Sequence, residues 1–282
     1  MEIINGKALA IEIKNQVKEK VKSSYLDVGK KAPTLACIIV EGNQASEVYV
    51  ASKEKACTEC LMNSRIIRLP GSVTQEELCQ TIEGLNVDDD VSGILLQLPL
   101  PKHLDENDAI NRIDSPKDVD CLTYSNLGRL FSAQPIIAPC TATGIIKILD
   151  SIGENITGKN AVVLGRSLLV GKSVANLLEQ RNATVTICHS KTVNLKEITS
   201  SADILVVAIG KAEYITDEYV KEGAIVIDVG INRLDSGLKG DVDFNSVKDK
   251  CSYITPVPGG VGPLTVACLM ENTLILDENR RK

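Results

Sequence analysis

The chain has 282 residues, 44% of them hydrophobic, which is enough for two domains with substantial cores. Its net charge is −6 and the only basic run is the short tail at 280–282, so nucleic acid is not expected as a partner. The N-terminus lacks the basic and apolar regions of a secretion signal, and the longest apolar run, 204–209, is too short to span a bilayer.

The cysteines and histidines argue against a metal site. Nine cysteines are scattered, mostly inside apolar patterns, and without an export signal we expect reduced thiols. Cys57 and Cys60 form one C-x-x-C, but no second pair and no nearby histidine completes a zinc set. The chain has only two histidines, His103 and His189, so a histidine-rich site is excluded.

The first 115 residues alternate between predicted helices and strands. Leu9, Ile13, Val17 and Val21 recur every four residues and mark one face of a first helix. The elements that follow are a strand at 34–40, a helix at 45–60, a strand at 66–69, a helix at 74–83, a strand at 93–98 and a helix at 107–113. This alternation predicts a parallel sheet with helices on both faces.

A polar break at 115–120 and a helix near 143–152 lead to a second alternation. It comprises strands at 160–164, 184–188, 204–208 and 224–228, with helices at 171–181, near 194–200 and near 216–221. This is a Rossmann-like succession. The final helix, at 262–278, needs a surface for its apolar positions, and we expect it to pack back on the first domain. The sequence therefore predicts an α/β protein with a catalytic domain at 1–140, joined by the returning segment 262–282, and a Rossmann-like domain at 141–261.

The stretch NAVVLGRSLLVGK, residues 160–172, is the strongest single signal for a ligand. Gly165 permits a sharp turn after a buried strand, and Gly171 lets the next helix start close to that strand. The N–H groups at the helix start can hold a phosphate. Ser167 stands where the second glycine of G-x-G-x-x-G would be, and a tight turn without any ligand also favours glycine.

The residues after strand 184–188 favour NADP over NAD. An NAD site usually has a carboxylate there for the ribose hydroxyl, whereas this chain has His189, Ser190 and Lys191. Arg166 and the Ser190 hydroxyl suit a 2′-phosphate. The alternative is that Arg166 and Lys191 are solvated surface charges.

Candidate chemistry in the first half centres on Tyr49 and Lys53, which share a helix face. If Lys53 faces the ligand, its amine can act as an acid or base, with Gln97 at a strand end holding it; otherwise the pair is surface decoration. Asp118 and Asp120 fit a solvated turn, which we prefer for Asp118, while Asp120 can accept bonds from adjacent ligand N–H donors.

The proline- and glycine-rich segment 255–263, TPVPGGVGP, permits two interpretations. It can simply connect the sheet to the last helix. It can also form a wall for a flat substrate, since glycines allow close approach.

Together these stretches resemble the bifunctional methylenetetrahydrofolate dehydrogenase/methenyltetrahydrofolate cyclohydrolase family. The similar segments occur in the family's order over nearly the whole chain. They are SEVYVASK at 46–53, GILLQLPLPK at 93–102, KDVD at 117–120, GRSLLVG at 165–171, DVGIN at 228–232, GDV at 240–242 and TPVPGGVGP at 255–263.

The resemblance implies NADP-linked oxidation of 5,10-methylenetetrahydrofolate to the methenyl form and hydrolysis to 10-formyltetrahydrofolate, in one-carbon metabolism and purine biosynthesis. It implies Lys53, Gln97 and Tyr49 as catalytic residues. It also implies a cytoplasmic homodimer. The implied substrate-binding residues are Tyr49, Asp120, Pro258, Gly259 and Gly260, and the implied cofactor-binding residues are Gly165, Arg166, Ser167, Val170, Gly171, Ser190, Gly210, Gly230 and Ile231.

The chain departs from the family beside Asp120, where Cys121 and Leu122 replace a usual glycine and phenylalanine. This departure leaves open a folate dehydrogenase with weak cyclohydrolase activity. The sequence is also compatible with two further functions. The chain could be a two-domain nicotinamide dehydrogenase that acts on another small cyclic substrate. It could also be a protein that senses a nucleotide without catalysing a reaction.

Overall fold

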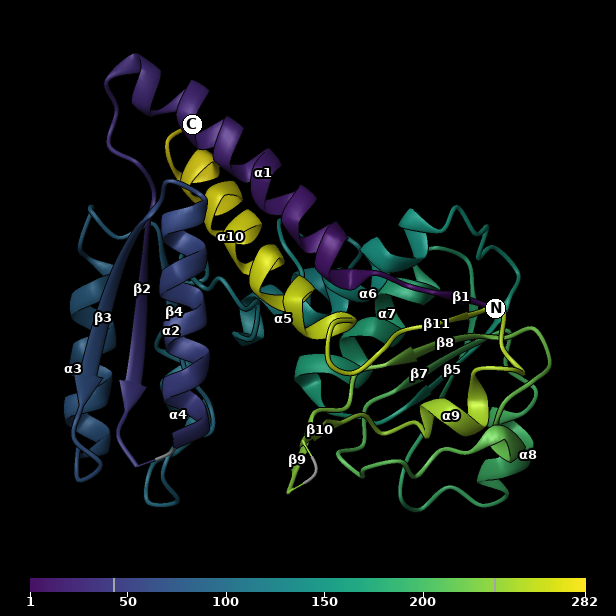
Figure 1. The fold of residues 1–282 in the computed structure, drawn as a ribbon. Helices are drawn as coiled ribbons and strands as arrows, with labels where there is room; N and C mark the ends of the chain where they lie inside the picture. Colours follow the sequence, from purple (N-terminus) through teal and green to yellow (C-terminus); the bar gives the residue numbers. More distant parts are fainter. Residues whose placement is uncertain (43, 236) are drawn as a thin grey trace. The chain divides into compact units, whose positions relative to one another are not determined.

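The computed structural model describes residues 1–42, 44–235 and 237–282 (Figure 1), and the side chains of residues 44–46 and 48 lie outside that description. The chain forms two compact units. The three-stranded unit comprises Ile11–Cys140 and Val266–Lys282, and the six-stranded unit comprises Met1–Ala10 and Thr141–Thr265. The fold is α/β, as predicted.

The three-stranded unit is built on a parallel sheet of order β3-β2-β4. Its strands are β2 at Thr34–Val40, β3 at Asn63–Leu69 and β4 at Gly93–Leu96. Every residue of β2 is buried, which is typical of a parallel strand covered on both faces. Leu35, Cys37 and Ile39 belong to one apolar cluster, whereas the intervening Ala36 and Ile38 belong to another.

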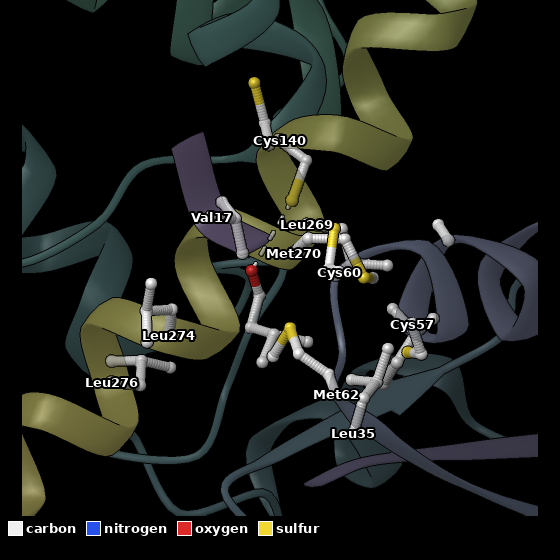
Figure 2. Packing of buried hydrophobic residues seen from close by; sticks show 14 of the residues in the cluster. Val17, Leu35, Cys57, Cys60, Met62, Cys140, Leu269, Met270, Leu274 and Leu276 are labelled. Carbon is white, nitrogen blue, oxygen red and sulfur yellow. Dashed lines mark hydrogen bonds between the residues drawn. The ribbon is translucent and has the colours of Figure 1, made fainter. Parts of the chain in front are cut away.

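The two apolar clusters show which helices cover which face. The first cluster takes residues from α1 (Gly6–Ser24), α2 (Gln44–Glu59) and α10 (Val261–Arg280), and Figure 2 shows part of it. The second takes residues from α3 (Gln75–Asn86) and α4 (Glu106–Asn111). The predicted parallel sheet with helices on both faces is therefore confirmed.

The C-terminal helix returns to this unit, as the sequence predicts. Leu269, Leu274 and Leu276 of α10 lie in the same cluster as Val17 and Val21 of α1. Figure 2 labels Val17 and the three leucines. α10 lies alongside α1 in Figure 1. Its apolar positions thus meet the first helix as well as the sheet.

A buried carboxylate holds the end of α10. Asp277 accepts hydrogen bonds from the Tyr25 hydroxyl and the Ser92 hydroxyl, both at 2.7 Å, and from Arg281 Nε at 2.5 Å and Arg280 Nη2 at 3.3 Å. Burial raises the pKa of Asp277, but the hydrogen bonds from Arg281, Ser92 and Tyr25 outweigh it, so the pKa lies below its ordinary value. Asp277 is therefore a charged link between α10, the turn after α1 and the residue before β4.

The six-stranded unit is a fully parallel sheet of order β1-β11-β8-β7-β5-β6. Its predicted strands are confirmed as β5 (Asn160–Leu164), β6 (Thr184–Cys188), β7 (Ile204–Val207) and β8 (Ile225–Asp228). Its helices include α6 (Cys140–Ser151), α7 (Ser173–Glu179) and α8 (Leu195–Thr199).

The first strand explains why the chain's beginning joins the second unit. β1 (Glu2–Ile3) pairs with β11 (Tyr253–Ile254) at the edge of the six-stranded sheet. The sequence pattern assigns residues 1–10 to the first domain, whereas the structure groups Met1–Ala10 with the six-stranded unit. Two-residue strands carry too little pattern to be recognised before their partner is known.

Several short elements differ from the prediction. The helix expected near 216–221 is only a 3₁₀ turn, Asp217–Tyr219. Helix α5 (Tyr124–Phe131) was not predicted; it begins after Thr123, whose hydroxyl accepts from Asn126 N at 3.3 Å, and few buried positions mark it. Also unpredicted are the hairpin β9 (Asn232–Leu234) and β10 (Gly237–Lys239), α9 (Phe244–Val247) and the 3₁₀ turn Leu26–Val28.

Among the described residues, none of the helices combines the length and the apolar character needed to cross a bilayer.

Replacing Asp277 by Asn should lower the free energy of unfolding of the three-stranded unit by about 2 kcal/mol at pH 7, because an amide cannot replace a carboxylate that accepts four donors. The folded-state pKa is depressed, so the carboxylate stabilises fully above about pH 4 and this contribution is lost as the pH falls through the folded-state pKa. Urea unfolding followed by circular dichroism at pH 7 and pH 3 measures both effects.

The matched control is Asp90→Asn in the same unit, because Asp90 also pairs with a cation, Lys31, but its side chain is 66% exposed. It should cost less than about 1 kcal/mol. An Asp277→Asn protein as stable as the wild type at pH 7, or one whose deficit does not shrink toward pH 3, would contradict this account.

Candidate active site

In the three-stranded unit, a lysine amine is held at the carboxyl end of the sheet. Lys53 on α2 donates from Nζ to Gln97 Oε1 at 2.7 Å, and Gln97 follows β4. The Gln97 amide donates in turn to the Leu98 carbonyl at 2.7 Å, so its oxygen faces the amine. Tyr49, one turn before Lys53, is 43% exposed. The predicted Lys53–Gln97 pair is therefore brought together, with an accessible ring beside it on the helix.

The segment KDVD is not the solvated turn that we preferred for Asp118. Asp118 is buried and accepts from Leu122 N at 3.2 Å, Thr123 N at 2.9 Å and Asn126 Nδ2 at 2.9 Å. The reason is that two backbone N–H groups without sheet partners lie beside it and need an acceptor, and the Asn126 amide adds a third donor. Lys117 is also buried and donates to carbonyls at the end of α3 and just beyond it.

Asp120 lies in the electrostatic field of Lys53. Burial raises the pKa of the Asp120 carboxyl, while the Lys53 charge and a hydrogen bond from the Cys140 thiol pull it down. Burial also holds the pKa of Cys140 well above its ordinary value, so the thiol remains a donor. Asn272 of α10 donates to the Cys140 sulfur at 3.4 Å and so supports this arrangement. The Lys53 amine, the Gln97 amide and the Asp120 carboxyl group thus form one polar cluster within this unit.

Cys121, which stands where the resembled family usually has glycine, adopts a backbone conformation that glycine favours. Its φ is +58°, in the left-handed region that glycine adopts without strain. The Cys121 side chain is buried, and its thiol donates to the Ile137 carbonyl at 3.4 Å. Cys121 therefore keeps a backbone conformation that favours glycine, and its side chain is taken up in the interior.

In the six-stranded unit, both predicted glycines of the turn after β5 are required by their surroundings. Gly165 has a φ of +130°, and a Cβ there would lie 2.3 Å from the Ala208 carbonyl oxygen. A Cβ on Gly171 would lie 2.3 Å from the Gly165 carbonyl oxygen. The Ser167 hydroxyl accepts from Val170 N at 3.3 Å and caps a π-helical turn, Leu168–Lys172, that leads into α7. The helix therefore begins three residues earlier than predicted, and its N-terminal N–H groups point toward the turn.

A cavity of about 250 Å³ opens beside this turn. The described residues that line it include no carboxylate, but they do include the cations Arg166 and Lys211. Ser190 and His189, which follow β6, line it as predicted for strand-end residues. The full lining is Leu164, Gly165, Arg166, His189, Ser190, Leu195, Ala208, Ile209, Lys211 and Tyr214. The cavity therefore fits a ligand that carries both an anionic group and an apolar ring, such as a nucleotide.

Two buried aspartates hold loops of the six-stranded unit, and sequence reasoning missed both. Asp228 at the end of β8 accepts from Gly230 N, Asp241 N and Val242 N, each at 2.9 Å. Burial raises the pKa of Asp228 to about 6, against the effect of these donors. Thr255 accepts from Asp228 N at 2.7 Å.

Asp241 does the same for the neighbouring loop. Its carboxylate accepts from Ile209 N at 2.6 Å, Gly210 N at 2.9 Å and Lys211 N at 2.8 Å, and from Asn232 Nδ2 at 2.8 Å. The signal for both residues is present in the segments DVGIN and GDV, which carry the family resemblance without assigning either aspartate a role.

The predicted glycines and Ile231 lie on these loops. Gly210 has a φ of +66°, and a Cβ on Gly230 would lie 2.3 Å from the Asp241 carboxylate. Ile231 is 47% exposed.

The predicted wall at 255–263 packs against the N-terminal end of α1 within the same unit. Lys7 N donates to the Gly259 carbonyl at 3.1 Å, and a Cβ on Gly6 would lie 2.0 Å from the Gly260 oxygen. Gly259 has a φ of +110°. The peptide bonds before Pro258 and before Pro99 are both cis. Among the described residues, no group of His, Cys, Asp and Glu could hold a metal ion.

Comparison with protein-family models matches both halves of the chain. Residues 4–120 match the tetrahydrofolate dehydrogenase/cyclohydrolase catalytic domain, and residues 139–281 match the NAD(P)-binding domain of the same family. A curated protein of Campylobacter fetus named Bifunctional protein FolD is 51% identical over 283 residues, covering 100% of this chain and 99% of its own.

Solved structures agree. The crystal structure of the bifunctional enzyme FolD, methylenetetrahydrofolate dehydrogenase/cyclohydrolase, from Campylobacter jejuni is 46% identical with a TM-score of 0.96, covering 99% of each chain. The corresponding Trypanosoma brucei enzyme, complexed with NADP cofactor and inhibitor, is 38% identical with a TM-score of 0.96, covering 100% of this chain and 98% of that one. This chain belongs to the tetrahydrofolate dehydrogenase/cyclohydrolase family.

Proposed function

We propose that this chain oxidises 5,10-methylenetetrahydrofolate to 5,10-methenyltetrahydrofolate with NADP and hydrolyses the product to 10-formyltetrahydrofolate. The observation that carries the proposal is the Lys53 amine bonded to Gln97 beside Asp120, in the part of the chain that matches the family's catalytic domain. A nicotinamide dehydrogenase for another substrate would not require this group, and a sensing protein would not require an acid or base.

Lys53 carries protons in the hydrolytic step. Water attacks the cationic methenyl carbon and loses both of its protons as the formyl C=O forms. One proton goes to the ring nitrogen whose bond to that carbon breaks, and the other leaves to solvent. A positioned amine contributes to such transfers, typically by a factor of about 10² to 10⁴. Gln97 supports this role because its oxygen fixes the amine and its own amide is fixed by the Leu98 carbonyl.

In the oxidation, the chain positions the substrate and the cofactor and does not need to supply a base. NADP, when bound, supplies the hydride acceptor, and the lone pair of a folate nitrogen drives the hydride out of the substrate. We assign Asp120 to the pterin's adjacent N–H donors, Tyr49 to its ring, and Pro258, Gly259 and Gly260 to a wall for a flat substrate. Holding the reactants in register is itself a large part of such catalysis.

Two features of the six-stranded unit, its glycine turn and the lining of its cavity, support NADP as the cofactor. The glycines let the turn pack closely and the helix start beside β5, because a Cβ at either would collide with backbone, and the N–H groups at that helix start can hold a phosphate. Arg166 and Ser190 line a cavity whose described lining includes no carboxylate, which suits a 2′-phosphate better than a free ribose hydroxyl. We assign the turn residues Gly165, Ser167, Val170 and Gly171 to the phosphates, and Gly210, Gly230 and Ile231 to the adjoining loops of the nucleotide site.

We also propose that the chain works in the cytoplasm as a homodimer. Family membership supports both statements. Light scattering on the purified protein should give a mass near twice 30.3 kDa. A mass near 30 kDa at assay concentration would reject the dimer.

The first test is Lys53→Met. Wild-type protein given 5,10-methylenetetrahydrofolate and NADP should form both methenyl and formyl products, followed by absorbance and by chromatography. The variant should lose cyclohydrolase activity by at least about 100-fold, because no amine remains to move the proton. Its affinity for NADP should stay within about twofold, because Lys53 lies outside the six-stranded unit.

Lys55→Met is the matched control, because Lys55 lies on the same helix with its side chain 79% exposed. It should hydrolyse at the wild-type rate. Hydrolysis by Lys53→Met at the wild-type rate would show that Lys53 is a surface residue that takes no part in the reaction. A wild-type protein that forms methenyl product but almost no formyl product would favour the dehydrogenase with weak cyclohydrolase activity.

The second test is Arg166→Ala. NADP binding should weaken by about 1.5–3 kcal/mol, because a charge-assisted hydrogen bond to the 2′-phosphate is lost, and NAD binding should change much less. Calorimetric titration with each nucleotide measures the difference. Arg181→Ala, which removes an exposed arginine paired with Asp150, should change neither affinity. Equal losses for NADP and NAD in Arg166→Ala would assign Arg166 to something other than the 2′-phosphate.

A further inference from the structure

A second cation shares the nucleotide cavity with Arg166. Lys211 lines the same cavity as Arg166 and Ser190, although it lies after a different strand, β7. The ion pairs described for the six-stranded unit use Lys159, Arg181, Lys196, Lys221 and Lys239. Within the described part of this unit, neither Arg166 nor Lys211 is therefore neutralised by a carboxylate. Two uncompensated charges on one cavity favour a ligand with more than one negative charge.

The backbone of Lys211 is fixed by the fully buried Asp241. The Lys211 N–H donates to Asp241 Oδ1 at 2.8 Å, and the two preceding N–H groups donate to Oδ2. Asp241 is itself held by Asn232. The point from which the Lys211 side chain leaves the loop is therefore set by a network of hydrogen bonds to one buried carboxylate.

The side chain of Lys211 is directed as well. Its Nζ lies over the ring of Tyr214, 5.1 Å from the ring centroid, and Tyr214 also lines the cavity. The electron-rich face of the ring attracts the ammonium group and leaves its other N–H donors available. Tyr214 thus holds the charge at the cavity without neutralising it.

Lys191 offers a contrast. It follows Ser190 directly, yet it does not line the cavity. Its backbone N–H donates to His189 Nδ1 at 3.1 Å within the turn after β6. Closeness in sequence to Ser190 therefore does not identify the second cation.

We propose that Lys211 is a specificity-determining residue that acts with Arg166 to select the nucleotide carrying a phosphate on its ribose. This inference rests on the proposed use of NADP. A phosphate monoester carries a charge of about −1.5 to −2 near pH 7, so a single cation leaves part of it uncompensated. NAD has a hydroxyl at that place and gains little from a second cation.

The test is Lys211→Met, which removes the charge but keeps an unbranched side chain that can lie on Tyr214. Calorimetric titration should show NADP affinity reduced by about 5- to 20-fold and NAD affinity changed by less than about twofold. Affinity for adenosine 2′,5′-bisphosphate should fall, whereas affinity for adenosine 5′-monophosphate should not. The NADP affinity of the variant should also depend less on salt concentration than that of the wild type.

Lys191→Met is the matched control, with the same charge change outside the cavity lining, and its NADP affinity should stay within about twofold of wild type. The inference is overturned if Lys211→Met lowers the affinities for NADP and NAD equally or lowers neither. It is also overturned if Lys191→Met, rather than Lys211→Met, lowers the affinity for NADP. These outcomes leave NADP-dependent folate oxidation standing. A wild-type protein that binds neither nucleotide would overturn the proposed function together with this inference.

Discussion

The loops of this protein depend on buried carboxylates that accept several backbone N–H groups at once. Where a parallel strand ends, the following N–H groups have no sheet partner, and leaving them unpaired in the interior is costly. Asp118, Asp228 and Asp241 each accept two or three of these groups. Each carboxylate therefore fixes a loop at the edge where parallel α/β sheets carry their ligands.

This constraint connects the structural and the functional residues. The carboxylate of Asp118 accepts hydrogen bonds from the backbone of its own loop. Asp120, two residues later, is therefore the carboxyl group whose pKa the Lys53 charge lowers. Asp241 holds 209–211, and the same segment supplies two residues to the nucleotide cavity. The residues that we assign to ligands are in this way oriented by residues to which we assign no ligand.

Much of the fold was predictable because its signals are local. Strands β2, β5 and β6 have the predicted bounds, since buried parallel strands are short apolar runs between turn residues. The elements that were missed have few apolar positions or none of their own. β1 exists because β11 lies beside it, and the 3₁₀ turn at Asp217–Tyr219 is too short to show a helical period.

The sequence by itself determined the two alternations, the glycine turn after β5, the absence of a carboxylate after β6 and the i, i+4 relation of Tyr49 and Lys53. Each of these is a property of neighbouring residues. Only the tertiary structure decided that Asp118 is buried, that Asp241 holds the loop after β7, and that Lys211 rather than Lys191 lines the cavity with Arg166. The physical reason is that burial and hydrogen bonding of a polar group depend on atoms brought to it from distant parts of the chain, which no local pattern contains.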